Sequence, residues 1–218
     1  EKKLMSIKEI LNLIPGTKIN VNVFPIRDIL TMNNFQGSKK SGNVYNYNAL
    51  VTNIIMNYVI FKSGDNFENL LHKVFNQKAK IKDKVYFHKS ERRNDPLNSG
   101  GGWYQFHAKR YDYLRIAKAI MDDWNNDTCV GKYLKTINEK RVNKKFKEYK
   151  PKMVERYSKS YGGQFHLNLV GMKKRNIFGL GGFGGQQILI DMDQKKIVQV
   201  HAEHFHYNWK KIVYNKIK

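Results

Sequence analysis

Apolar residues recur every three to four positions through the first two thirds of the chain, which is typical of amphipathic helices. This spacing predicts helices over residues 6–13, 26–32, 47–61, 66–74, 109–124 and 130–137. The longest apolar one, 47–61, ends at Ser63-Gly64-Asp65, a sequence that favours a helix stop. A short strand is predicted over Val85–Phe87.

Beyond about Pro151 the apolar period changes to two, which indicates half-buried strands. Strands are predicted over 164–169, 188–192 and 197–202, and a last helix over 208–217. Helices followed by about three antiparallel strands indicate an α+β fold, an antiparallel sheet packed with a helical region. We expect a single domain over residues 1–218, with a mainly helical part at 1–150 and the strands and C-terminal helix at 151–218.

The run Gly179-Leu180-Gly181-Gly182-Phe183-Gly184-Gly185-Gln186-Gln187 interrupts this second part. Its glycines leave a backbone with almost no Cβ atoms, which another molecule can approach closely. The run fits G-x-G-x-x-G, but a phosphate-binding loop opens a helix, whereas an alternating apolar strand follows here. Two interpretations stay open, a plain glycine-rich turn or a strand that lines a substrate cleft.

The chain is strongly basic, with 40 Lys and Arg against 18 Asp and Glu and a net charge of +22. Such a charge is compatible with nucleic-acid binding. Lysines greatly outnumber arginines, however, and they are spread along the whole chain, so no nucleic-acid partner is expected. The densest basic stretch, 140–150, is interpreted as a solvated linker or helix face. No apolar stretch reaches the length of a membrane span, and the compartment stays open.

Other groups of reactive residues give no coherent site. His201, His204 and His206 form H-x-x-H-x-H, but strand alternation would split them between two faces, so no metal site is expected. The carboxylates of the helix over 109–124 are expected to be solvated or to cap helices, and these are Asp112, Asp122 and Asp123. The single Cys129 is expected to fill a small apolar gap. No cofactor is expected.

Five segments, in order along the chain, resemble the penicillin-binding and class C β-lactamase-like serine hydrolases. Residues 25–32, Pro-Ile-Arg-Asp-Ile-Leu-Thr-Met, are similar to the family's I-R-D-L-L-T-M segment. Residues 47–75 resemble the helix pair that follows its Y-x-N box, and Ser99-Gly100-Gly101-Gly102-Trp103-Tyr104 resembles its S-G-G-G-L-Y turn. Tyr161–Phe165 resembles the G-Y-G-x-x-W strand, and Gly182–Gln186 resembles the third box in its G-x-G-G-Q form.

The resemblance implies hydrolysis of a small-molecule amide or ester through an acyl-enzyme. In the family a serine of an S-x-x-K box attacks the carbonyl, the box lysine and the Y-x-N tyrosine move the proton, and the third-box strand gives a backbone N–H to the oxyanion. By position, Tyr47 is then the catalytic base or proton relay. The substrate-binding and oxyanion strand comprises Gly182, Gly184, Gly185 and Gln186.

Three departures from the family pattern shape the expectation. No serine of the chain has a lysine three residues later, so we expect this chain to be the C-terminal part of a longer protein and inactive alone. Ala49 stands where the Y-x-N asparagine is expected, and Tyr45 is an alternative register that fits no better. Leu180 stands where many relatives have Lys or His, which disfavours β-lactams. The alternatives are a degenerate relative that binds a ligand without catalysis and, behind it, a basic nucleic-acid binder. Oligomeric state stays open.

Overall fold

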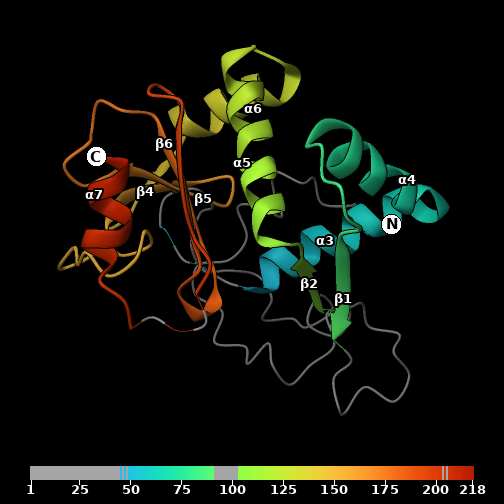
Figure 1. Ribbon diagram of the computed structural model, residues 1–218, viewed down its shortest axis with the longest axis horizontal. Coiled ribbons are helices and arrows are strands. Elements are labelled where there is room, and N and C mark those ends of the chain that lie inside the picture. The colour runs from blue at the N-terminus through green and yellow to red at the C-terminus, as the bar shows by residue number, and fades with distance from the viewer. Residues whose placement is uncertain (1–44, 46, 48, 91–102, 203, 205) are drawn as a thin grey trace, which may run out of the picture. The chain divides into compact units, whose positions relative to one another are not determined.

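The computed structural model describes residues 45, 47, 49–90, 103–202, 204 and 206–218 of the chain (Figure 1). The chain divides into two compact units. The first holds the described residues up to Gln77 and those between Asp83 and Ala108, and the second holds Lys78–Lys82 and Lys109–Lys218. The helices predicted over 6–13 and 26–32, and the turn at 99–102, lie outside the described residues.

The first unit contains consecutive helical segments and a two-stranded antiparallel ribbon. The helical segments are α3 (Ala49–Ser63), η2 (Gly64–Asn66), α4 (Phe67–Leu71) and η3 (His72–Lys78, of which Lys78 falls in the second unit). The ribbon pairs β1 (Tyr86–Ser90) with β2 (Trp103–His107). Both predicted helices and the short strand are therefore confirmed, whereas β2 was not predicted. The rings of Phe75 and Phe106 stack at 5.1 Å.

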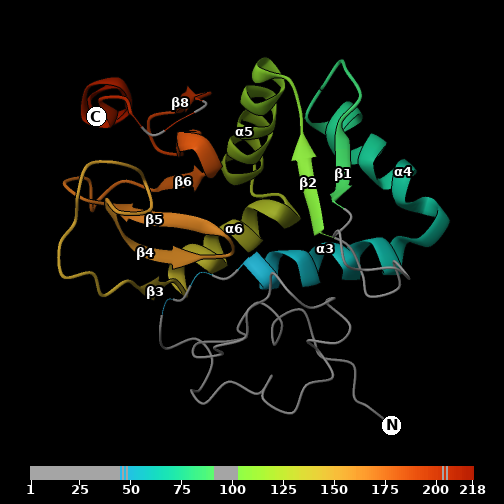
Figure 2. The ribbon, with the colours of Figure 1, turned by 90° about the horizontal axis from the view of Figure 1, so that it is seen from below.

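The second unit is built on a six-stranded antiparallel sheet in which neighbours along the chain are neighbours in the sheet. Its strands are β3 (Val142–Asn143), β4 (Ser158–Gly162), β5 (Phe165–Leu169), β6 (Ile177–Gly181), β7 (Gln187–Asp191) and β8 (Lys196–Val200). Figure 2 shows this order from β3 to β6. The α+β class is thus confirmed, but with six strands in this sheet instead of about three.

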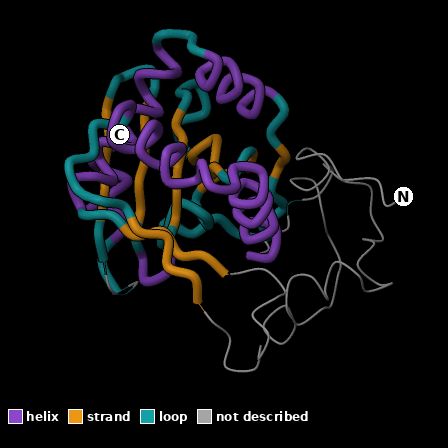
Figure 3. The backbone as a smooth tube through the Cα atoms, turned by 90° about the vertical axis from the view of Figure 1, so that its right-hand side faces the viewer, coloured by secondary structure: helices purple, strands orange, loops and turns teal. Residues whose placement is uncertain are grey.

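Helices cover both faces of this sheet (Figure 3). Helices α5 (Arg110–Asn125) and α6 (Cys129–Glu139) pack on one face. The C-terminal segment, η5 (Lys210–Tyr214) and α7 (Asn215–Ile217), packs on the other. Each interface is an apolar cluster: Ala117, Met121, Leu134, Leu167, Phe178, Ile190 and Met192 on the first face, and Val154, Leu169, Met172, Ile177, Leu189, Trp209, Val213 and Ile217 on the second.

Strand alternation explains the two clusters. Along β6, Ile177 joins the C-terminal cluster and the next residue, Phe178, joins the α5–α6 cluster. Leu167 and Leu169 are two residues apart and should share a face, yet they belong to different clusters. Asn168 between them has a φ of 58°, and this left-handed residue breaks the alternation.

Several burial predictions are wrong. Asp112 and Asp123 are buried, the former beside Arg115 and the latter bound by Lys78 and by the hydroxyl of Thr128. Thr128, rather than an aspartate, caps α6, because its Oγ1 accepts the N–H of Gly131 at 3.1 Å. Cys129 does not fill an apolar gap but is exposed.

Candidate functional site

The glycine loop, defined here as Gly182–Gln186, connects β6 to β7 at one end of the sheet. The strands pair up to Gly181 opposite Gln187, and the N–H of Gly182 donates to the carbonyl of Gln186 at 2.8 Å to close the loop. The run therefore joins two antiparallel strands and opens no phosphate-binding helix. Gly184 and Gly185 have φ values of 81° and 90°, which only glycine adopts without strain.

The loop is fixed from one side by the segment before the C-terminal helix. The hydroxyl of Tyr207 donates to the carbonyl of Gly185 at 2.5 Å, and burial raises the pKa of this hydroxyl. A Cβ atom on Gly185 would lie 2.8 Å from the carbonyl oxygen of His204. This glycine is thus required for close packing as well as for its backbone conformation.

The amides of the loop are not equivalent. Those of Gly182 and Gly185 are used inside the loop, the latter donating to the carbonyl of Gly182 at 3.3 Å. Gly184 lies between them in a single helical turn, Phe183–Gly185. Of the three glycines predicted for this edge, Gly182 is exposed, whereas Gly184 and Gly185 are buried.

Tyr47, the predicted proton relay, precedes α3 and is 56% exposed. Ala49, at the expected asparagine position, is the first residue of that helix. Tyr47 belongs to the first unit and the glycine loop to the second, so their pairing in one site stays a prediction.

The buried neighbour Gln187, and not Gln186, organises the base of the loop. Its side-chain Oε1 accepts the N–H of Val154 at 2.9 Å, and its Nε2 donates to the carbonyl of Gln186 at 2.7 Å. Val154 is fully buried against β6. Sequence reasoning missed both residues, although a polar residue at an inward strand position is a signal for such a role.

A second group of buried polar residues was not predicted. It is connected to Val154 through Ser158, and its centre is Lys144, which is only 3% exposed. Its Nζ lies 2.6 Å from Ser158 Oγ, 2.8 Å from the carbonyl oxygen of Glu155 and 2.9 Å from His166 Nδ1. The interpretation of residues 140–150 as a solvated linker or helix face is therefore wrong at this position. The run also supplies the edge strand β3.

Burial dominates the electrostatics of this group. Desolvation lowers the pKa of Lys144 to about 7, although the nearby Glu155 carboxylate acts in the opposite direction. Burial, and then the charge of Lys144, lower the pKa of His166 to about 3, so this imidazole is neutral at physiological pH. An amine that titrates near pH 7 is rare and points to a role for its proton.

The histidine motif near the C-terminus does not form a metal centre in the described part of the chain. The rings of His204 and His206 lie 5.6 Å apart, and the N–H of His206 donates to His204 Nδ1. His201 lies beside the ring of Tyr113 instead. Within the described residues, no group of three His, Cys, Asp or Glu side chains could hold a metal ion.

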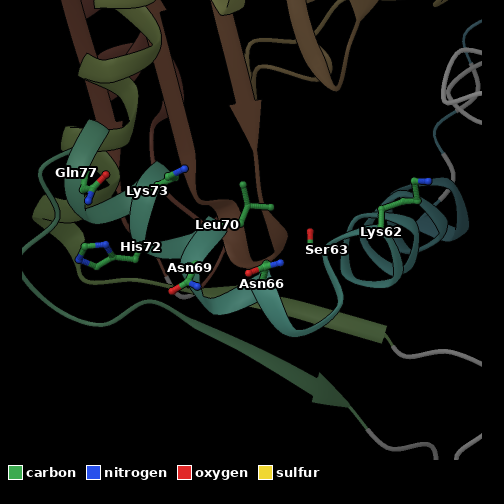
Figure 4. Close-up of a pocket in the computed structure, with 8 residues that line it drawn as sticks. All are labelled: Lys62, Ser63, Asn66, Asn69, Leu70, His72, Lys73 and Gln77. Atoms are coloured by element: carbon green, nitrogen blue, oxygen red, sulfur yellow. The ribbon is translucent and has the colours of Figure 1, made fainter.

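A pocket of about 530 Å³ opens in the first unit, along the end of α3 and the helical segments that follow (Figure 4). It is lined by Lys62, Ser63, Asn66, Asn69, Leu70, His72, Lys73 and Gln77. Figure 4 shows Lys62 at one end and His72, Lys73 and Gln77 at the other. The lining offers amines and amides but no carboxylate, which suits an anionic or polyhydroxylated molecule. It includes neither Tyr47 nor any residue of the glycine loop.

No helix in the described ranges combines the length and apolar character needed to cross a bilayer. Comparison of the chain with protein-family models, with curated proteins and with solved structures gave no match.

Proposed function

We propose that this chain is part of a serine hydrolase related to the β-lactamases, which cleaves a small-molecule amide or ester through an acyl-enzyme. The observation that carries the proposal is the glycine loop at the end of an antiparallel sheet, in the position of the family's third box, with Gly181 and Gly182 exposed at its start. The five family-like segments, in the family's order, support it further.

In this proposal the loop stabilises the tetrahedral intermediate. A backbone amide of the loop donates to the oxyanion, and a fixed N–H dipole costs no reorganisation when the charge develops. Tyr47 takes the proton of the attacking serine and returns it to the leaving group. The serine itself lies in an S-x-x-K box outside these 218 residues, so the chain alone does not turn over substrate by this route.

Leu180 narrows the substrate class. It stands in β6, opposite Ile188, where many relatives have a cationic or imidazole side chain. Without that partner a substrate carboxylate, as in β-lactams, gains no ion pair at this position. We therefore favour esters or amides that lack a carboxylate next to the scissile bond.

The test begins with the protein from its native source, whose N-terminus is mapped and which is treated with a fluorophosphonate that labels activated serines. We expect the label on a serine upstream of Glu1 that has a lysine three residues later. Replacing Tyr47→Phe in that protein should lower kcat/KM for a p-nitrophenyl ester about 10²–10⁴-fold, because the proton relay is lost. The matched variant Tyr45→Phe should keep the rate.

Full activity in Tyr47→Phe would contradict the proposed relay, and a labelled serine among those of this chain would contradict the proposed nucleophile. If the native protein begins near Glu1 and takes no label, the result favours the second candidate function, that of a relative that binds its ligand without catalysis. The observation that favours it is Ala49, which removes an amide side chain from the expected substrate contacts.

A further inference from the structure

Hydrogen bonds lead from Lys144 to the glycine loop through Ser158, Val154 and Gln187. The Lys144 amine donates to Ser158 Oγ at 2.6 Å, and that hydroxyl donates to the carbonyl of Val154 at 2.6 Å. The N–H of Val154 donates to Gln187 Oε1 at 2.9 Å, and Gln187 Nε2 donates to the carbonyl of Gln186. The carbonyl and the N–H of Val154 belong to different peptide groups, so the coupling across this residue is carried by the position of its backbone, which both bonds hold.

Close packing makes this connection stiff. Val154 lies against β6, where a Cβ atom on Gly179 would come within 2.3 Å of its Cγ2 and one on Gly181 within 3.5 Å of its Cγ1. The bare backbone of the glycine strand therefore makes room for Val154. His166, which contacts the Lys144 amine, also pairs with Gly179 across the sheet, which gives a second, shorter path.

The protonation state of the Lys144 amine decides which hydrogen bonds it can form with its partners. An ammonium has three N–H donors, and the structure offers three neutral acceptors, a hydroxyl, a carbonyl and an imidazole nitrogen. The neutral amine has two donors and one lone pair. It can then keep Ser158 and Glu155 only as weaker, uncharged bonds, while His166 moves its proton from Nε2 to Nδ1 and donates it to the amine.

Other titratable and charged groups surround the amine. Glu155 favours its charged form and Arg156 disfavours it. Tyr149 donates its hydroxyl to the Lys144 carbonyl, the ring of Tyr161 lies against His166, and the carbonyl of Lys159 accepts the Lys144 N–H. Apart from Glu155 and Arg156, these groups are neutral or contribute only backbone here, so the change of charge is centred on Lys144.

We propose that Lys144 is a positioning residue whose protonation state sets the geometry of the glycine loop through Ser158, Val154 and Gln187. The inference rests on the proposed function for the catalytic role of the glycine loop. Its test does not, because it measures the conformation of the loop directly and needs no substrate turnover. The ammonium tightens the series of bonds and fixes the loop in the conformation described, and the neutral amine loosens it.

The experiment is a pH titration, from 5.5 to 9, of the folded 218-residue chain by amide NMR. The glycine amides of the loop should shift with one midpoint near pH 7, and the side-chain signal of Lys144 should titrate with that same midpoint. In Lys144→Met the shift of the loop amides should be lost. In Ser158→Ala, Lys144 should still titrate while the response of the loop falls, because the link is cut.

His204 is the confounding group, since its carbonyl oxygen lies close to Gly185 and its side chain is an imidazole. The matched control is His204→Asn, which should leave the shift of the loop amides in place. Persistence of that shift in Lys144→Met, or its disappearance in His204→Asn, would overturn the proposal. So would a Lys144 that titrates while the loop amides stay still. Should Lys144→Met not fold, Ser158→Ala decides the question in the same way.

Discussion

At the scale of single residues, Lys144 shows how a basic run can hide an interior group. Its neighbours in sequence, Lys145 and Lys147, are exposed, while its own side chain turns inward toward Ser158. Burying an ammonium costs several kcal/mol unless hydrogen bonds and charges compensate, and the three acceptors offset only part of this cost. The uncompensated part of the desolvation cost disfavours the charged amine and so lowers the pKa of Lys144.

This depressed pKa predicts how stability depends on pH. Above pH 7 the unfolded chain holds a proton on this amine that the folded protein has released, so the free energy of unfolding rises with pH. The slope should be about 1.4 kcal/mol per pH unit, or about 2–3 kcal/mol between pH 7 and pH 9. Urea denaturation at several pH values measures it. Lys144→Met should show no such slope, and an equal slope in that variant would contradict the prediction.

At the scale of elements, Val154, in the segment before β4, packs against β6 where glycines provide no side chain. Gly179 and Gly181 both face Val154, but only the Gly179 position is too close for a methyl group. The glycine run therefore has two structural parts, a strand that accepts Val154 and a loop that needs positive φ at Gly184 and Gly185.

Replacing Gly179→Ala should consequently lower the free energy of unfolding by about 1–3 kcal/mol through overpacking. Gly181→Ala is the matched control in the same strand, and it should cost less because the nearest atom to its new methyl group lies 3.4 Å away. Val154→Ala should remove most of the penalty of Gly179→Ala when the two are combined. Equal destabilisation by both glycine variants, measured by thermal or urea unfolding, would show that strand propensity and not Val154 is responsible.

The sequence predicted those elements whose apolar period is regular. Strands β5, β7 and β8 and helices α5 and α6 follow such a pattern, and their bounds were close. Helix α3 is apolar on most sides and was predicted as the longest apolar segment. Strand β4 was missed because Ser158 and Ser160, its buried positions, are polar. In the candidate site, local sequence revealed the glycine loop itself. It could not reveal Gln187 or Lys144 as partners of the loop, because their contacts join residues 33 and 14 positions apart.

At the scale of the whole second unit, one arginine ties the chain end to the sheet. The Arg175 guanidinium binds the fully buried carboxylate of Asp191 on β7, and it donates to the carbonyls of Ile217 at 2.7 Å and Lys218 at 3.2 Å. Asp191 also accepts the N–H groups of the turn that follows β7. A single ion pair thus orders the C-terminal helix, the sheet and a turn together.

Arg175→Met should lower the free energy of unfolding by about 3–5 kcal/mol, because it leaves the Asp191 carboxylate buried without its cation. The matched control is Lys118→Met, which removes the exposed pair with Asp122 and should cost no more than about 1 kcal/mol. Adding Asp191→Asn to Arg175→Met should recover part of the loss. If Arg175→Met unfolds no more easily than Lys118→Met, as read by urea denaturation, the ion pair does not hold this unit together.

The open outer side of β8 also has a consequence for how copies of this protein behave in a crowded solution. Among the described strands, β8 has a neighbour on one side only, so the backbone along its other side can accept a strand from elsewhere. Its central residues Ile197 and Val198 are apolar and offer little to deter such a partner. The net charge of +22 makes copies of the protein repel one another, which opposes pairing between their β8 strands. We therefore expect the abundance of lysine to disfavour association between strand edges of different copies.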